Sequence, residues 1–199
     1  RAVSITADGV NSRVELANLV NFIYVYSCGD GTGEDRFSIM TVNNGGTIAA
    51  PSMTNLVGVL LRLNNNGTLP IEQLISFNNS RAEITGIGRS FDNLINANGS
   101  QFLITNVAVN LGSVTTMTHG SVTLSSGGTA NLNQLQNIDS ASFYVSGGVT
   151  LTLPSVASYT HTSTANSQYR YFRAQGSGSR IELPNLSSIT NGTHYNSNI

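Results

Sequence analysis

The sequence predicts an all-β chain wound into a right-handed parallel β-helix, a β-solenoid of about seven coils with loops of variable length. Three observations lead to this fold class: apolar residues recur with a spacing of two, turns rich in Asn and Gly separate short β-rich runs, and one pattern returns along the chain. A spacing of two places apolar side chains on one side of a strand, which favours strand over helix. We expect residues 1–199 to form a single β-solenoid domain, a fragment of a longer repeat protein.

The recurring pattern has apolar or small residues at its third, fifth, eighth and eleventh places, and in three copies a proline follows at the sixth place. The five clearest copies are "SRVELANLVNF" (12–22), "GTIAAPSMTNL" (46–56), "GTANLNQLQNI" (128–138), "VTLTLPSVASY" (149–159) and "SRIELPNLSSI" (179–189). Proline ends a strand because it cannot donate to the ladder. We therefore expect the third and fifth places to point into the coil, just before a bend.

Two weaker copies, "SRAEITGI" from Ser80 and "SQFLITNV" from Ser100, fit the first half of the pattern. With them, the fifth-place residues recur at intervals of 20 to 34 residues, which is typical of stacked repeats. An antiparallel sandwich would also show short strands and turns. It would not readily repeat one bend in this way, so the solenoid is preferred.

Composition argues against two classes of partner. Only 10% of the residues are charged, against about 25% in ordinary soluble domains, the nine basic residues are all arginine, and the net charge is −1. Nucleic-acid binding and polybasic membrane contact both require a basic patch. The longest apolar run, Leu56 to Leu63, has the length of a strand and is far below the roughly 20 residues of a spanning helix. We therefore expect neither a nucleic-acid partner nor membrane insertion.

The sole cysteine, Cys28, excludes a disulfide framework within the chain and any cysteine-based zinc cluster. A nucleophilic cysteine would need a histidine and an orienting partner, and the histidines stand far away in sequence at 119, 161 and 194. We expect Cys28 to be a small buried hydrophobe.

The phrases "SGGVTLTLPSVASYTHTS" (146–163) and "FRAQGSGSRIELPNLSSITNGTHYNS" (172–197) resemble the β-strand repeats of large exported bacterial proteins with right-handed parallel β-helix regions. The resemblance implies a secreted or cell-surface location and a non-catalytic structural, adhesive or glycan-binding role, with neighbouring repeats of the same chain as partners. "LPNLSSI" (183–189) also resembles a leucine-rich repeat, including the receptor L-domain type, but the strands lack the regular leucine register.

An enzyme is the alternative, because many polysaccharide lyases and glycoside hydrolases are built on a parallel β-helix. Fold alone does not carry function. The acidic residues are scattered apart from one group, and no paired carboxylates with a recognisable motif support glycoside hydrolysis. Convergence of Asp30, Glu34, His161 and Arg170 in one groove would favour the enzyme.

The candidate ligand-binding residues are Tyr169, Arg170, Tyr171 and Arg173. Exposed tyrosines suit sugar rings because they offer an apolar face and a polar edge, and arginine suits a carboxylate or a sulfate. On a strand, Tyr169, Tyr171 and Arg173 would share one face, and Arg170 and Phe172 the other. If Phe172 points into the coil, Arg170 must lie near a strand end to escape burial. In the alternative interpretation, these aromatic residues fill a wider coil.

The candidate metal site is the loop "GDGTGED" (29–35), in which Asp30, Glu34 and Asp35 could supply oxygens to Ca²⁺. The spacing does not match an EF-hand loop, and a solvated loop is the alternative. No other cofactor is expected.

Two polar patterns have both a binding and a structural interpretation. "SR-x-E" occurs at 12–15, 80–83 and 179–182, and Asn-rich turns punctuate the chain. They could bind anions or sugar hydroxyls. They could equally form ion pairs and asparagine ladders between coils.

Overall fold

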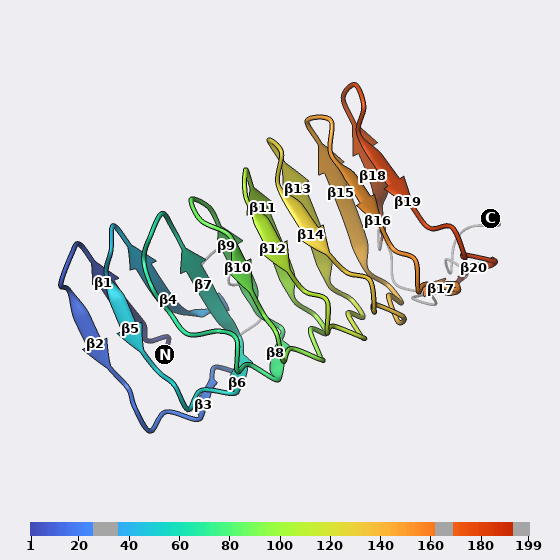
Figure 1. Cartoon of the computed structure of the whole chain (residues 1–199). Coiled ribbons are helices and arrows are strands. Elements are labelled where there is room, and N and C mark those ends of the chain that lie inside the picture. The colour runs from blue at the N-terminus through green and yellow to red at the C-terminus, as the bar shows by residue number, and fades with distance from the viewer. Residues whose placement is uncertain (26–35, 162–168, 193–199) are drawn as a thin grey trace.

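The computed structural model describes residues 1–25, 36–161 and 169–192. Within these ranges the chain is all-β, and every strand pairing is parallel (Figure 1). The predicted fold class is confirmed: the chain is a parallel β-solenoid whose coils stack along one axis. None of the described segments forms a helix long and apolar enough to cross a membrane.

Each coil has three sides, which we call the first, second and third faces. The first face is a continuous eight-stranded sheet of β1 (Ser4–Asp8), β4 (Ser38–Asn43), β7 (Val59–Leu63), β9 (Arg81–Ile84), β11 (Gln101–Thr105), β13 (Ser121–Ser125), β15 (Ser142–Ser146) and β18 (Phe172–Gln175). The second face holds β2 (Arg13–Glu15), β5 (Thr47–Ala49), β10 (Arg89–Ser90), β12 (Ala108–Asn110), β14 (Thr129–Asn131), β16 (Thr150–Thr152) and β19 (Arg180–Glu182). The third face holds β3 (Asn21–Ile23), β6 (Asn55–Val57), β8 (Ser76–Asn78), β17 (Ser158–His161) and β20 (Ser188–Asn191), with single bridges at 96, 116 and 137 between β8 and β17.

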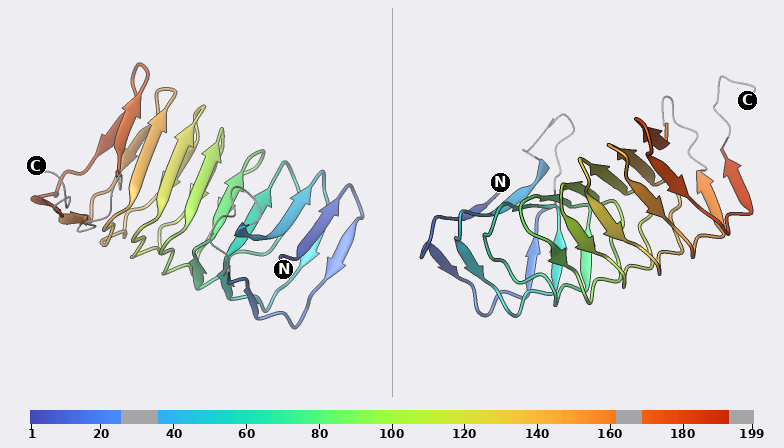
Figure 2. Two further views of the ribbon diagram at one scale, coloured as in Figure 1. Left: turned by 180° about the vertical axis from the view of Figure 1, so that it is seen from behind. Right: turned by 45° about the horizontal axis from the view of Figure 1, so that its top comes forward.

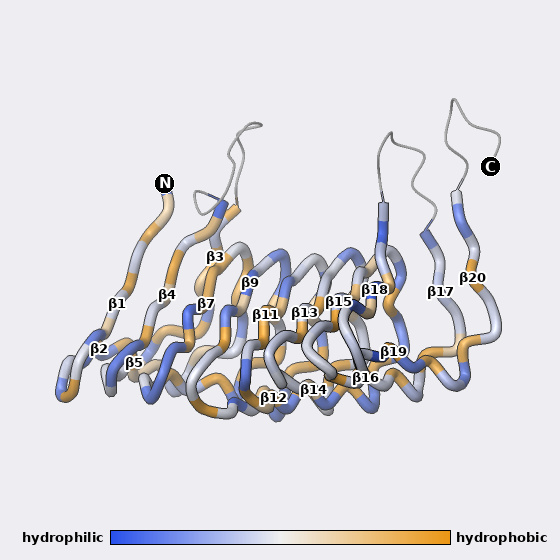
Figure 3. The backbone as a smooth tube through the Cα atoms, turned by 90° about the horizontal axis from the view of Figure 1, so that it is seen from above, coloured by the Kyte–Doolittle hydropathy of each residue, from blue (hydrophilic) through white to orange (hydrophobic). Residues whose placement is uncertain are grey.

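The winding is right-handed. In Figure 1 the first face lies at the back, and its strands run upward. The chain then crosses at the top to the second face in front, and successive coils follow from left to right. Figure 3, seen from above, shows the first face behind the second in the same way. Parallel strands joined by a crossover are nearly always connected in this sense.

Coil length is 20 or 21 residues through the middle of the solenoid, as the in-register partners on the first face show. The first interval is 35 residues and the last is 29. Both longer intervals have their additional residues after a third-face strand, at the corner that leads back to the first face. The variation in coil length therefore falls between the third face and the first.

The recurring pattern corresponds to the second and third faces. Its third place lies in the second-face strand, its fifth place follows that strand at the start of the corner, and its eleventh place lies in the third-face strand. Ile48, Ala50 and Leu56 occupy these three places in one coil, and all are fully buried. At the corner, the amide of the eighth place donates to the carbonyl of the fifth. This bond recurs in the pairs Leu19–Leu16, Met53–Ala50, Leu74–Ile71, Leu94–Phe91, Val114–Leu111, Leu135–Leu132 and Leu186–Leu183.

The two weaker copies of the pattern belong elsewhere. "SRAEITGI" and "SQFLITNV" supply β9 and β11, which lie on the first face. Ile84 and Ile104 therefore do not align with Ala50 or Leu132, although both are buried. Any strand of a solenoid alternates inward and outward residues, so apolar spacing alone cannot tell one face from another.

The core runs along the solenoid axis and is filled from all three faces. The hydropathy of the chain alternates along the strands in Figure 3, as inward apolar and outward polar positions require. Phe77 from the third face, Phe91 from the corner after the second and Phe102 from the first meet with ring centroids 5.5 to 6.4 Å apart. Tyr159 takes the same inward place as Phe77 in a later coil and is 3% exposed.

Polar ladders connect the coils at the corner after the third face. The Asn78 and Asn98 side-chain carbonyls accept the amides of Asn98 and Thr118 one coil further on, at 3.0 and 2.7 Å, and Asp139 accepts that of Thr160 at 2.7 Å. At the start of the third-face strands, the Asn55 side chain also donates to that of Asn21 in the preceding coil at 3.1 Å. The structural interpretation of these asparagines therefore has direct support.

The arginines of two "SR-x-E" phrases form ion pairs on the outer surface. Arg13 pairs with Glu15 within its own strand, and Arg81 pairs with Glu83 at 2.8 Å. Arg62 of the preceding coil reaches Glu83 at 3.3 Å. Of these pairs, Arg62–Glu83 joins two coils, as the structural interpretation predicted, whereas the other two lie within single strands.

Candidate functional site

The candidate site lies on the outer side of the first face, over its last strands. Phe143 pairs with Phe172 and Val145 with Ala174, and the Phe143 and Phe172 rings stack at 5.7 Å on the inner side. Because side chains alternate, Tyr144 and Arg173 must both project outward from adjacent strands, in register with one another. Thr123 occupies the same outward position one strand earlier.

Tyr171 immediately precedes β18 and is tied to β15 by its backbone. Its amide donates to Ser142 Oγ at 3.1 Å, and its carbonyl accepts the amide of Phe143 at 2.7 Å. Its ring lies 5.8 Å from the Tyr144 ring and 6.5 Å from the Tyr169 ring. Three tyrosines thus gather on one outer surface.

The Arg173 guanidinium lies over this cluster. Its Cζ is 4.8 Å from the Tyr171 ring centroid and 6.0 Å from that of Tyr144. A guanidinium over an aromatic face is held by attraction to the ring quadrupole, while its N–H edge stays available for hydrogen bonds. We call Tyr144, Tyr169, Tyr171 and Arg173 the tyrosine–arginine surface.

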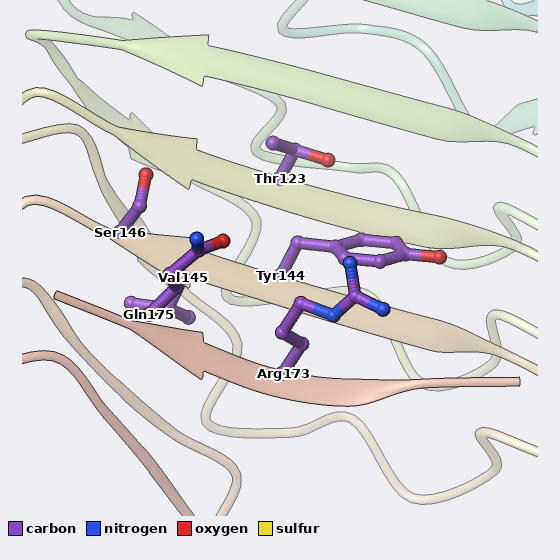
Figure 4. A pocket seen from close by; sticks show the side chains of 6 residues that line it. All are labelled: Thr123, Tyr144, Val145, Ser146, Arg173 and Gln175. Carbon is purple, nitrogen blue, oxygen red and sulfur yellow. The ribbon is translucent and has the colours of Figure 1, made fainter.

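A hollow of 360 Å³ adjoins this surface (Figure 4). Its lining residues are Thr123, Tyr144, Val145, Ser146, Arg173 and Gln175. Figure 4 shows the Arg173 side chain turned toward the Tyr144 ring, with Ser146 and Gln175 further along the same two strands. The hollow therefore combines an aromatic wall, one cationic group and several hydroxyl or amide groups.

Arg170 is placed differently from its neighbours. Phe172 stacks on Phe143 on the inner side of the sheet, and Arg170 precedes β18. Because Arg170 lies two residues before β18, its guanidinium is not enclosed in the core. Its Nε donates to the Ser140 carbonyl at 2.6 Å, and its Nη1 donates to the Tyr169 carbonyl at 2.9 Å. Arg170 thus contacts the backbone of the preceding coil, and its role in ligand binding stays a prediction.

Phe172 and Tyr159 fit the alternative interpretation, in which aromatic residues fill the inside of the coil. Their rings meet edge to face at 5.0 Å, and the Tyr159 hydroxyl donates to the Ala141 carbonyl at 3.1 Å. Burial raises the pKa of Tyr159 to about 12. Tyr159 is core at 3% exposed, and Phe172 packs on it from the last coil while keeping 37% of its surface exposed. Tyr169 is 69% exposed and Tyr171 is 36% exposed, and both rings lie on the outer side.

His161 and Arg170 converge on one residue of the preceding coil. The Ser140 hydroxyl lies 2.9 Å from His161 Nδ1, while its carbonyl accepts from Arg170. Ser140 has a φ of 58°, but Asn79 and His119 have the same left-handed conformation at the equivalent place of other coils. The conformation is therefore a feature of the repeated corner.

Asp30, Glu34 and Asp35, together with Cys28, lie outside the described residues, so calcium binding at 29–35 stays a prediction. In the ranges that the structure does describe, no three His, Cys, Asp or Glu side chains come close enough together to hold a metal ion.

A wider hollow of 730 Å³ lies on the second face and includes Arg89. Arg89 takes an inward place of the pattern, where Leu69 and Val109 stand in other coils, and its Nη2 donates to the Gly67 carbonyl at 2.7 Å. Burial lowers the pKa of Arg89. Because that guanidinium donates to the backbone and lies over no aromatic ring of the described residues, we regard the tyrosine–arginine surface as the better candidate.

Comparison of the chain with protein-family models, with curated proteins and with solved structures finds no match in any of the three. The class of protein is therefore defined by the architecture, a parallel β-solenoid.

Sequence reasoning missed Tyr144. It stands in "SFYVS" (142–146), outside the stretch that drew attention. Alignment of that run with "YFRAQ" (171–175) would have placed Tyr144 beside Arg173, since the two lie 29 residues apart, the length of the last coil.

Proposed function

We propose that this chain is a non-catalytic β-solenoid module of a secreted or cell-surface protein, and that it binds a glycan through the tyrosine–arginine surface. One observation carries the proposal: in-register stacking brings Tyr144, Tyr171 and Arg173 together on an outer face, beside a hollow lined by hydroxyl and amide groups.

The chemistry of this surface fits a sugar. A pyranose has an apolar face that packs on a tyrosine ring, and hydroxyls that hydrogen-bond at its rim. Tyr144 offers such a ring within the hollow, with the Tyr171 ring beside it, while Thr123, Ser146 and Gln175 offer polar groups at the rim. Tyr144 and Arg173 stand on paired strands, and a rigid site loses little conformational entropy on binding.

The extracellular location is supported by the sequence and not by the geometry of the site. The resemblance of residues 146–163 and 172–197 to the repeats of exported bacterial proteins implies it. A chain with 10% charged residues and many Asn, Ser, Thr and Gly is consistent with such repeats.

The test is a glycan array with the purified chain, followed by calorimetric titration of each glycan that binds. We expect Tyr171→Ala to weaken binding, and Ile95→Ala, an exposed apolar residue on the third face, to leave it unchanged. Incubation of the same glycans with the chain, with detection of new reducing ends and unsaturated products, tests the alternative enzyme. Product formation, or the absence of any bound glycan, would overturn the proposal.

A further inference from the structure

The charge of Arg173 has no carboxylate partner on the first face among the residues that the structure describes. Arg62 and Arg81 project from the same face, and both pair with Glu83. Arg173 instead lies over the Tyr171 ring, and it is the one charged residue among the six that line the hollow.

We propose that the tyrosine–arginine surface selects an acidic sugar, whose carboxylate or sulfate binds the Arg173 guanidinium; this rests on the proposed glycan-binding function. The guanidinium lies over the Tyr171 ring, with its Cζ 4.8 Å from the ring centroid, and its planar fork can present two N–H groups side by side to two oxygens of the anion. Little side-chain entropy is then lost on binding.

The polar groups around Arg173 are spaced for one sugar ring. Tyr144 and Arg173 are cross-strand neighbours, as are Ser146 and Gln175, and each pair is two residues from the other. Strands lie about 4.8 Å apart and alternate residues about 6.6 Å apart. A ring seated between them places its acidic group at Arg173 and its hydroxyls within reach of Ser146 and Gln175.

The same arrangement disfavours a neutral sugar. A neutral ring would keep the contact with tyrosine but would leave the guanidinium edge to water. A charge-assisted pair contributes more than a neutral hydrogen bond, which gives the acidic ligand its advantage.

The test uses three probes: a short oligogalacturonate, its carboxyl-reduced neutral form, and a sulfated galactan oligosaccharide. Each is titrated calorimetrically into the wild-type chain and into Arg173→Gln, Arg173→Lys and Arg180→Gln. Arg180 is the matched control because it is an exposed arginine of the same coil on the second face. The two anionic probes distinguish a carboxylate ligand from a sulfate ligand.

We expect at least one anionic probe to bind more tightly than the neutral form, and Arg173→Gln to weaken only the anionic binding, by about tenfold or more. Arg173→Lys should recover part of the loss, because it keeps the charge without the planar fork. Arg180→Gln should bind as the wild type does.

Equal binding of acidic and neutral probes, or an equal loss of both in Arg173→Gln, would overturn the acidic selectivity. If that neutral binding were still sensitive to Tyr171→Ala, the glycan-binding function itself would stand. If no probe and no arrayed glycan bound, both proposals would fall.

Discussion

Tyr171 and Tyr159 show how aromatic residues of adjacent coils serve different purposes. Tyr171 is partly exposed beneath Arg173, whereas Tyr159 is buried and donates to a backbone carbonyl. Their substitution should therefore affect different properties of the protein.

We expect Tyr171→Ala to weaken glycan binding by about 1 kcal/mol or more while changing the free energy of unfolding little. Tyr169→Ala, which removes a more exposed ring farther from Arg173, should weaken binding less. Thermal melts followed by titration well below the melting temperature separate the two effects. A loss of about 3–5 kcal/mol in stability for Tyr171→Ala would instead identify that ring as core.

The raised pKa of Tyr159 predicts a pH dependence of stability. Burial favours the neutral phenol in the folded state, so the unfolded chain loses this proton first, near its ordinary pKa of 10. Between pH 10 and the folded pKa of about 12 the folded state holds more protons. Its stability should therefore fall as pH rises, by up to about 1.4 kcal/mol per pH unit.

Urea denaturation of wild type and Tyr159→Phe across this pH range tests the assignment. The unfolding free energy of the wild type should fall relative to that of Tyr159→Phe as pH rises. Parallel curves would show that Tyr159 does not titrate in this way.

At the scale of the strands and corners, the coils are joined by side chains as well as by backbone ladders. Ser80 and Ser100 are fully buried at the corner before the first face. Ser100 Oγ accepts the Ser80 amide at 3.0 Å and donates to the Phe77 carbonyl at 2.7 Å.

We expect Ser100→Ala to destabilise the chain by about 1–3 kcal/mol, because it leaves the buried Ser80 amide without that acceptor. Ser121→Ala is the matched control, since Ser121 points outward from the next coil. Chemical denaturation gives both values. Equal stability of the two variants would contradict a structural role for the buried hydroxyl.

The corner at Gly58 offers a second test of the stacking. Gly58 has a φ of 65°, and a Cβ built there would lie 2.0 Å from the Tyr24 carbonyl oxygen of the preceding coil. Gly127 also has a positive φ, of 83°, but its Cβ would have room, with Asn106 Oδ1 the nearest atom at 3.8 Å.

Gly58→Ala should therefore lower the melting temperature more than Gly127→Ala, which bears only the conformational cost of roughly 1 kcal/mol. Calorimetric scans of the two variants give the comparison. A smaller loss for Gly58→Ala would mean that the coils approach less closely at this corner.

The bend was predictable from the sequence because it repeats: the fifth and eighth places, such as Leu132 and Leu135, close the same hydrogen-bonded corner in coil after coil. The assignment of faces was less accessible, as Ile84 and Ile104 show, since inward places of different faces share one apolar spacing. The candidate site was half predictable. Tyr171 and Arg173 stand in one conspicuous stretch, whereas Tyr144 joins them only through the register of two strands.

At the scale of the whole molecule, each further coil of the chain lies one strand spacing farther along the solenoid axis. In the views of Figure 2 the coils follow one another along a single axis from β1 to β20. Among the described strands, β18, β19 and β20 pair with β15, β16 and β17 of the preceding coil.

The central claim is that each coil adds one in-register strand to the first face, because this register builds the tyrosine–arginine surface. One column of outward residues on the first face contains Thr6, Leu103, Thr123 and Arg173. Leu103 is four strands from Thr6, Thr123 is five and Arg173 is seven. At about 4.8 Å per step, Thr6 should lie roughly 19, 24 and 34 Å from the other three.

The most direct measurement is pulsed electron–electron resonance between spin labels in a Cys28→Ser background, with one label at position 6 and the second at 103, 123 or 173. Single distances that increase in proportion to the number of strand steps are predicted. A separation between positions 6 and 173 no longer than that between 6 and 103, as a chain folded back in an antiparallel sandwich would give, would contradict the account.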